Sequence, residues 1–277
     1  MEQARGAIEL MRPGNAVAAG VLTVIGAFVA GGLHRPMLAA FAVAATVFAT
    51  GGGNAINDYF DREIDAINRP DRPIPRGAIA PRGALAFSIA LFVAAVALTL
   101  LLPLAAVVIA VVNLVALVAY TELFKGLPGV GNALVGYLTG STFLYGGTAV
   151  RGDLAPVVVL FVLAASATVA REIVKDVEDL EGDREEGLRT LPIAIGERNA
   201  LTIAAVFVGV AVIASPVPYL SGTFGAAYLV GLAPAVFGLA AGTYRSFGDP
   251  GAGQRWLKAS MFVAAIAFVV GRAAAVF

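Results

Sequence analysis

The chain has 277 residues, of which 59% are hydrophobic and 14% are charged, and its mean hydropathy is +0.85. A composition this apolar excludes a soluble globular protein and predicts one that crosses a membrane many times. The absence of cysteine excludes disulfides and thiolate metal sites, and a single histidine, His34, leaves no imidazole cluster. Any metal must therefore be held by oxygen.

Apolar stretches long enough to span a bilayer predict nine transmembrane helices. They cover residues 14–33, 37–56, 83–102, 104–121, 130–149, 155–175, 199–216, 223–243 and 257–276. We expect an all-α, multispanning membrane protein whose residues 1–277 form a single domain. Loops at about 57–82, 122–129 and 176–198 are predicted to cap one side of it.

The charged residues are distributed very unevenly between the two sides of this predicted topology. All of the 19 Lys and Arg residues except Arg35, Arg151 and Arg272 fall on the side of the N-terminus. The positive-inside rule then predicts a multi-pass protein of the cell membrane with a cytoplasmic N-terminus. All of the 19 acidic residues except Asp153 lie on that side too, although acids do not set orientation. Their crowding there predicts a polar active site facing the cytoplasm.

Two acidic motifs, at the ends of the second and sixth predicted spans, share one spacing. Aspartates fall at i, i+3 and i+7 in both: Asp58, Asp61 and Asp65 in the first motif, and Asp176, Asp179 and Asp183 in the second. On a helix each set forms one carboxylate face. Six such carboxylates repel one another unless cations neutralise them, and Mg²⁺ is the oxygen-preferring cation that completes its shell with water and substrate phosphates. Two faces opposed across a cavity would therefore bind Mg²⁺ and a phosphate or diphosphate.

Basic residues near the motifs supply the complementary charge. They are Arg69, Arg72 and Arg76 in the first long loop, Lys125 after the fourth span, and Arg171 and Lys175 beside the second motif. Such groups neutralise phosphate oxygens and stabilise a departing diphosphate. Ordinary solvated loops also carry charge, and Arg72 and Arg76 could be simple membrane anchors, but the repeated aspartate spacing favours ionisation of a diphosphate ester above an apolar cavity.

The patterns Asn57-Asp58-x-x-Asp61-x-x-x-Asp65 and Asp176-x-x-Asp179-x-x-x-Asp183 resemble the two aspartate-rich signatures of the UbiA superfamily of intramembrane prenyltransferases. Residues 9–15, 68–77 and 171–193 further resemble an archaeal glycerol-lipid branch of that family. Arg76 departs from the branch, which often has serine there.

The resemblance implies nine helices around a central cavity, with the two motifs facing each other on the cytoplasmic side. It also implies Mg²⁺-dependent transfer of a geranylgeranyl group from geranylgeranyl diphosphate to the sn-2 hydroxyl of geranylgeranylglyceryl phosphate. The expected partners are the bilayer, a prenyl diphosphate donor and a lipid-like acceptor, with no nucleic acid and no obligate protein partner.

The resemblance also assigns roles to residues of this chain. The metal ligands would be Asn57, Asp61, Asp65, Asp176, Asp179 and Asp183, with Asp58 in support. Of these, Asp61, Asp65, Asp176 and Asp183 would be catalytic together with Lys125. Lys125 and Arg72 would hold the diphosphate, with Tyr120 nearby and with Arg171 and Lys175 also binding substrate. For the acceptor phosphate our hypothesis is Arg12, supported by Asn15, because the first helix starts on the same face.

Three other functions fit parts of the pattern. The same chemistry could act on an aromatic acceptor, namely a quinone precursor, a chlorophyllide or haem. A CDP-alcohol phosphotransferase also binds metal through aspartates, but its Asp-Gly and Ala-Arg arrangement is absent here. A cation transporter would place its carboxylates near the bilayer midplane, whereas these lie at helix ends.

Overall fold

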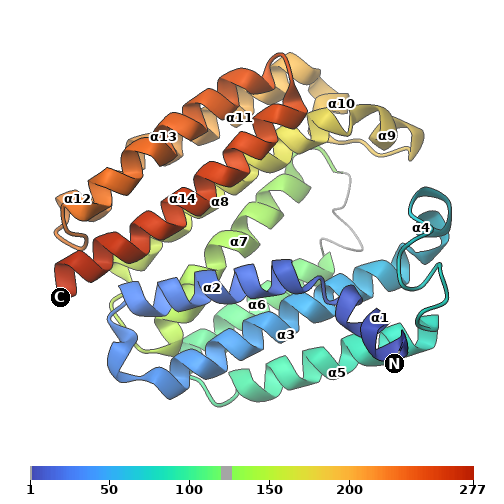
Figure 1. Ribbon diagram of the computed structural model, residues 1–277, viewed down its shortest axis with the longest axis horizontal. Helices are drawn as coiled ribbons and strands as arrows, with labels where there is room; N and C mark the ends of the chain where they lie inside the picture. Colours follow the sequence, from blue (N-terminus) through green and yellow to red (C-terminus); the bar gives the residue numbers. More distant parts are fainter. Residues whose placement is uncertain (1, 120–126) are drawn as a thin grey trace.

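The computed structural model describes residues 2–119 and 127–277, which contain helices and no strands (Figure 1). Each predicted span overlaps one long helix. The long helices are α2 (Pro13–Val29), α3 (Pro36–Phe60), α5 (Pro81–Thr99), α6 (Leu104–Ala119), α7 (Val130–Ala149), α8 (Ala155–Glu178), α11 (Glu197–Ala214), α13 (Ala227–Ser246) and α14 (Pro250–Val276). The short ones are α1 (Glu2–Leu10), η1 (Gly32–His34), α4 (Arg62–Asn68), α9 (Leu180–Glu185), α10 (Leu191–Ile195) and α12 (Val217–Leu220).

Fewer of these helices qualify as membrane spans than the nine that the sequence predicts. Within the described residues, six helices are long and apolar enough to cross a bilayer: α3, α5, α8, α13, α14 and the pair α11 and α12. A seventh span forms if α1 and α2, which meet at a 47° bend, count as one. The helix α6 is short, and α7 is long enough but rich in glycine, serine and threonine.

The segments predicted as cap loops contain helical turns. Both long helices that carry a motif extend beyond the apolar stretch, α3 to Phe60 and α8 to Glu178, and the short helices α4, α9 and α10 follow. The i to i−4 backbone hydrogen bonds continue through the first motif, since the Asp61 N–H donates to the backbone carbonyl oxygen of Asn57 at 2.8 Å. A search for apolar stretches misses these turns because they are polar. Of the predicted loop 122–129, only residues 127–129 belong to the described chain.

The short helices divide between the two ends of the molecule. In Figure 1, α1, α4, α9 and α10 lie at the end where α3 and α8 terminate, whereas η1, α12 and the C-terminus lie at the opposite end. This arrangement places both aspartate motifs at one end of the helical body.

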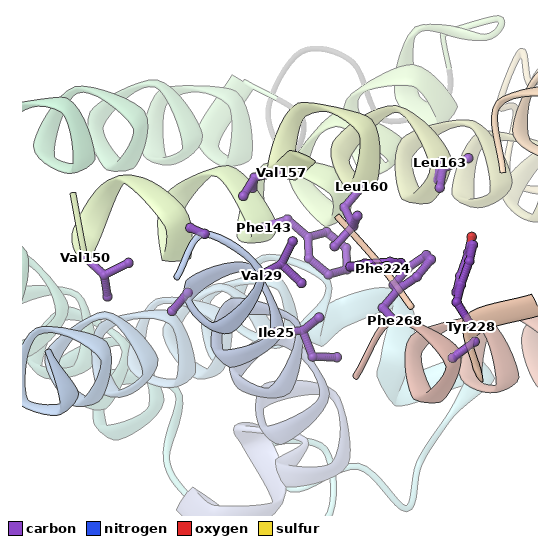
Figure 2. Close-up of a cluster of buried hydrophobic side chains, with 13 residues drawn as sticks. Ile25, Val29, Phe143, Val150, Val157, Leu160, Leu163, Phe224, Tyr228 and Phe268 are labelled. Carbon is purple, nitrogen blue, oxygen red and sulfur yellow. The ribbon is translucent and has the colours of Figure 1, made fainter. Parts of the chain in front are cut away.

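An aromatic cluster packs five long helices together towards the opposite end (Figure 2). Phe143, Phe224, Tyr228 and Phe268 make ring contacts with centroids 4.9 to 6.2 Å apart. They pack with buried aliphatic side chains of α2 and α8. The Tyr228 hydroxyl donates to the backbone carbonyl oxygen of Ser215 at 2.8 Å. Because buried apolar contacts of this kind fix helix positions, the cluster holds these five helices in place relative to one another.

Candidate active site

The two aspartate motifs have equivalent backbone structures. Each motif begins in the last turn of a long helix and ends on a short one, and its middle aspartate occupies the break between them. The break residues have nearly the same backbone, with φ −79° and ψ 2° at Asp61 and φ −90° and ψ 7° at Asp179. The repeated spacing in the sequence therefore reflects a repeated local structure.

The two segments that follow the motifs touch each other. The Asn68 Nδ2 donates to the Glu186 Oε1 at 3.2 Å. Both residues lie three positions after the last aspartate of their motif, so equivalent points of the two repeats meet. This contact joins the segments that follow the two motifs, at the end of the helical body where α3 and α8 terminate.

The first motif is neutralised by arginines. Arg72 Nη1 lies 2.5 Å from Asp65 Oδ2 and 3.2 Å from Asp58 Oδ1, and Arg12 Nη2 lies 2.5 Å from the same Asp58 oxygen. Asp58 and Asp65 are only 4% and 6% exposed. Arg12 itself has a left-handed backbone, with φ 47°, at the bend between α1 and α2. The ion pair holds this strained residue in place.

The loop that carries Arg72 is folded back onto the helical body. Ile74 and Ile79 are buried in a cluster with Leu10 of α1 and with residues of α3 and α5. Arg76 Nη2 lies 2.5 Å from Glu9 Oε2, so Arg76 ties the loop to α1. Arg69 is exposed. Among the ion pairs of the described residues, Arg72 is the arginine of this loop that pairs with motif carboxylates.

The second motif carries more uncompensated negative charge. Asn132 Nδ2 of α7 donates to Asp176 Oδ2 at 2.7 Å, and Lys175 Nζ lies 3.7 Å from Asp179 Oδ2. No guanidinium group pairs with its three aspartates within the described chain, because Arg171 pairs with its neighbour Glu172. Burial raises the pKa of Asp183 above its ordinary value, and the nearby carboxylates add to the effect.

A large apolar cavity opens beneath the motifs. Its volume is about 940 Å³, near the upper end of ligand pockets, and every one of the nine long helices contributes to its wall. Asn57 of the first motif, Asn15, Arg171 and Lys258 supply polar groups to a lining that is otherwise mostly apolar. Lys258 is not among the site residues predicted from the sequence; its signal there is a charge inside the last predicted span.

The donor set at the motifs suits a hard divalent cation. No group of three or more His, Cys, Asp or Glu side chains converges to hold a metal ion among the residues that the structure describes. Such a cage is not required, because Mg²⁺ usually takes one or two carboxylates and completes its shell with water and substrate phosphates. The aspartates of the two motifs and the amide of Asn57 offer oxygen ligands of this kind. Tyr120 and Lys125, which were predicted to bind substrate, lie outside the described residues.

Residues 19–266 match the model of the UbiA prenyltransferase family. The chain belongs to this family. It is 74% identical over 276 residues to digeranylgeranylglyceryl phosphate synthase of Natronomonas pharaonis, and the match covers 100% of both chains. These findings confirm the resemblance seen in the sequence and identify the chain as a prenyltransferase.

Solved structures have the same all-helical fold. A structure of digeranylgeranylglyceryl phosphate synthase in membranes is 36% identical, with a TM-score of 0.85, and the match covers 98% of this chain and 99% of that one. A UbiA homologue from Archaeoglobus fulgidus bound to GPP and Mg²⁺ is 18% identical, with a TM-score of 0.76, over 98% and 100% of the two chains. At that identity the second likeness shows the fold alone.

Proposed function

We propose that this prenyltransferase forms the second ether bond of archaeal membrane lipids. It transfers a geranylgeranyl group from geranylgeranyl diphosphate to the sn-2 hydroxyl of geranylgeranylglyceryl phosphate. The observation that carries the proposal is the 74% identity, over the whole of both chains, to a digeranylgeranylglyceryl phosphate synthase. The large apolar cavity beneath two carboxylate motifs suits a lipid-like donor and acceptor with phosphate groups.

The motifs are the proposed Mg²⁺ site. Asn57, Asp61, Asp65, Asp176, Asp179 and Asp183 would hold the ion, with Asp58 supporting the first motif through its arginine partners. When bound, Mg²⁺ neutralises the charge that develops on the diphosphate leaving group. A UbiA homologue of the same fold has been solved with Mg²⁺ bound, which supports the choice of ion but not the choice of ligands.

Different side chains of the protein bind the diphosphate, accept the proton and exclude water. Arg72, Lys125 and Lys175 hold the diphosphate as the allylic C1–O bond breaks and its electron pair passes to the leaving group. The acceptor oxygen attacks the carbocation-like C1, and the hydroxyl proton passes to a motif carboxylate or to the released diphosphate. The apolar wall excludes water, which would otherwise intercept the cation.

The proposal includes the topology on which the site depends. All nine long helices would cross the membrane as one domain over 1–277, and the N-terminus and both motifs would face the cytoplasm. Support comes from the shared cavity, which all nine helices line, and from the gathering of the polar short helices at one end. The contact between Asn68 and Glu186 supports motifs that face each other.

Two substitutions test the proposed site. Asp61→Ala and Asp183→Ala should each lower the rate of prenyl transfer by about 100-fold or more, because a lost ligand weakens stabilisation of the leaving group. The matched control is Glu185→Ala, which removes an exposed carboxylate of α9 outside the motif. All variants should elute as folded protein in detergent. Near-normal turnover by either aspartate variant at saturating Mg²⁺ would show that its carboxylate is not a metal ligand.

A further inference from the structure

We infer that Lys258 and Arg171 form the subsite for the phosphate group of the acceptor, apart from the motifs that hold the donor diphosphate. This inference rests on the proposed function, in which the acceptor is a glycerol lipid with a phosphate group. It replaces Arg12 as the main phosphate ligand of the acceptor.

Lys258 and Arg171 lie at the same depth in the helical body. The helices α8 and α14 pack against each other, and a Cβ on Gly251 would stand 2.8 Å from the Glu178 Oε1. From that contact, Arg171 is seven residues back along α8 and Lys258 is seven residues forward along α14. For antiparallel helices, equal steps of about 1.5 Å per residue bring the two positions level.

The deeper contacts of the same two helices agree with this register. In antiparallel helices, the residue numbers of two level positions have a constant sum. This sum is 429 for Gly251 with Glu178 and for Lys258 with Arg171. It is 430 for Leu163 of α8 with Ala267 of α14, which belong to one buried cluster. Both basic side chains also line the large apolar cavity. Two cations therefore face the same space from neighbouring helices.

The charge of Lys258 is uncompensated, unlike that of Arg12. Lys258 has no ion pair within the part of the chain that the structure describes, whereas Arg12 is paired at 2.5 Å with the buried Asp58. Arg171 pairs with Glu172, but a guanidinium has five N–H donors and can bind a second anion. Lys258 is exposed and Arg171 is half-buried, so both cationic groups are accessible from the cavity, and together they suit a phosphate dianion.

The position also suits the geometry of the reaction. Arg171 precedes Asp176 by five residues, which is about 7.5 Å along α8. In the acceptor, the phosphate is carried by the carbon next to the one that bears the reacting hydroxyl. A phosphate held by Lys258 and Arg171 would therefore keep that hydroxyl in the part of the cavity nearest the second motif.

Steady-state kinetics with two acceptors tests the inference. The acceptors are geranylgeranylglyceryl phosphate and the same lipid without its phosphate, with geranylgeranyl diphosphate as donor. Lys258→Met should raise KM for the phosphorylated acceptor about tenfold or more, leave KM for the donor unchanged, and shrink the preference for the phosphorylated acceptor. Lys258→Arg should keep most of that preference. Arg255→Gln, which removes a cation of α14 outside the cavity lining, is the matched control.

Other outcomes distinguish a failure of the phosphate subsite from a failure of the proposed function. If Lys258→Met keeps the preference for the phosphorylated acceptor, or raises KM for the donor instead, the subsite is wrong. The subsite is also wrong if Arg12→Ala raises KM for the acceptor and Lys258→Met does not. If the unaltered protein transfers no prenyl group to either acceptor, the proposed function fails.

Discussion

At the scale of single residues, the two motifs share a spacing of aspartates but differ in the side chains that pair with them. The first has two buried carboxylates paired with arginines, and the second has an amide donor and a lysine. The aspartates could be predicted because their spacing is local and repeated. The pairing of Arg12 with Asp58 could not be, since 46 residues separate them in the chain and only the bend between α1 and α2 brings them together.

Arg72 should matter for stability as well as for binding. In Arg72→Met, the buried Asp58 would keep its pair with Arg12, but the buried Asp65 would lose its pair with Arg72. The free energy of unfolding should therefore fall by about 3–5 kcal/mol. Chemical unfolding in detergent measures the loss. Adding Asp65→Asn to the same chain should restore part of it, because the uncompensated charge is then removed. An unfolding free energy that does not change in Arg72→Met would contradict this description of the pair.

At the scale of helices, the apolar stretches predict where the long helices lie but not where they end or what they touch. The ends of α3 and α8 are polar, so hydrophobicity alone stops short of Phe60 and Glu178. The glycines of α7 permit close packing, but which helix they contact depends on the folded structure. A methyl group on Gly146 would overlap the Thr23 oxygen of α2, so the backbones of α2 and α7 are in contact there.

That contact gives a prediction for α2 and α7. Gly146→Ala should destabilise the protein by about 1–3 kcal/mol, because the two helices must move apart. Gly209→Ala is the control, since a Cβ there meets nothing within 4 Å and alanine favours a helix over glycine. Thermal unfolding in detergent compares the two variants. Equal melting temperatures for Gly146→Ala and the unaltered protein would show that the helices tolerate the added group.

At the scale of the whole molecule, the distribution of charge predicts one orientation in the membrane. The chain has no cysteine, so single introduced cysteines can report it cleanly. Arg189→Cys, exposed between α9 and α10, should react with an impermeant maleimide only from the cytoplasmic side. Ser221→Cys, exposed after α12, should react only from outside. The reverse pattern, or labelling of both from one side, would contradict the topology.

The cavity is also a property of the whole molecule. The sequence predicts an apolar space beneath the motifs, but its walls depend on how nine helices pack. The same packing places Lys258 level with Arg171, which no pattern within either helix indicates. The two aspartate faces, which are the proposed metal site, could thus be predicted from local spacing, whereas the proposed acceptor subsite required the register between helices.

Competition between acceptors is the most direct test of which reaction the protein catalyses. Purified protein would be given labelled geranylgeranyl diphosphate, Mg²⁺ and a mixture of geranylgeranylglyceryl phosphate with aromatic acceptors, and the products would be identified by mass spectrometry. We expect one labelled product, digeranylgeranylglyceryl phosphate, which disappears when EDTA removes the metal. A labelled aromatic product in its place, or undiminished transfer in EDTA, would contradict the account.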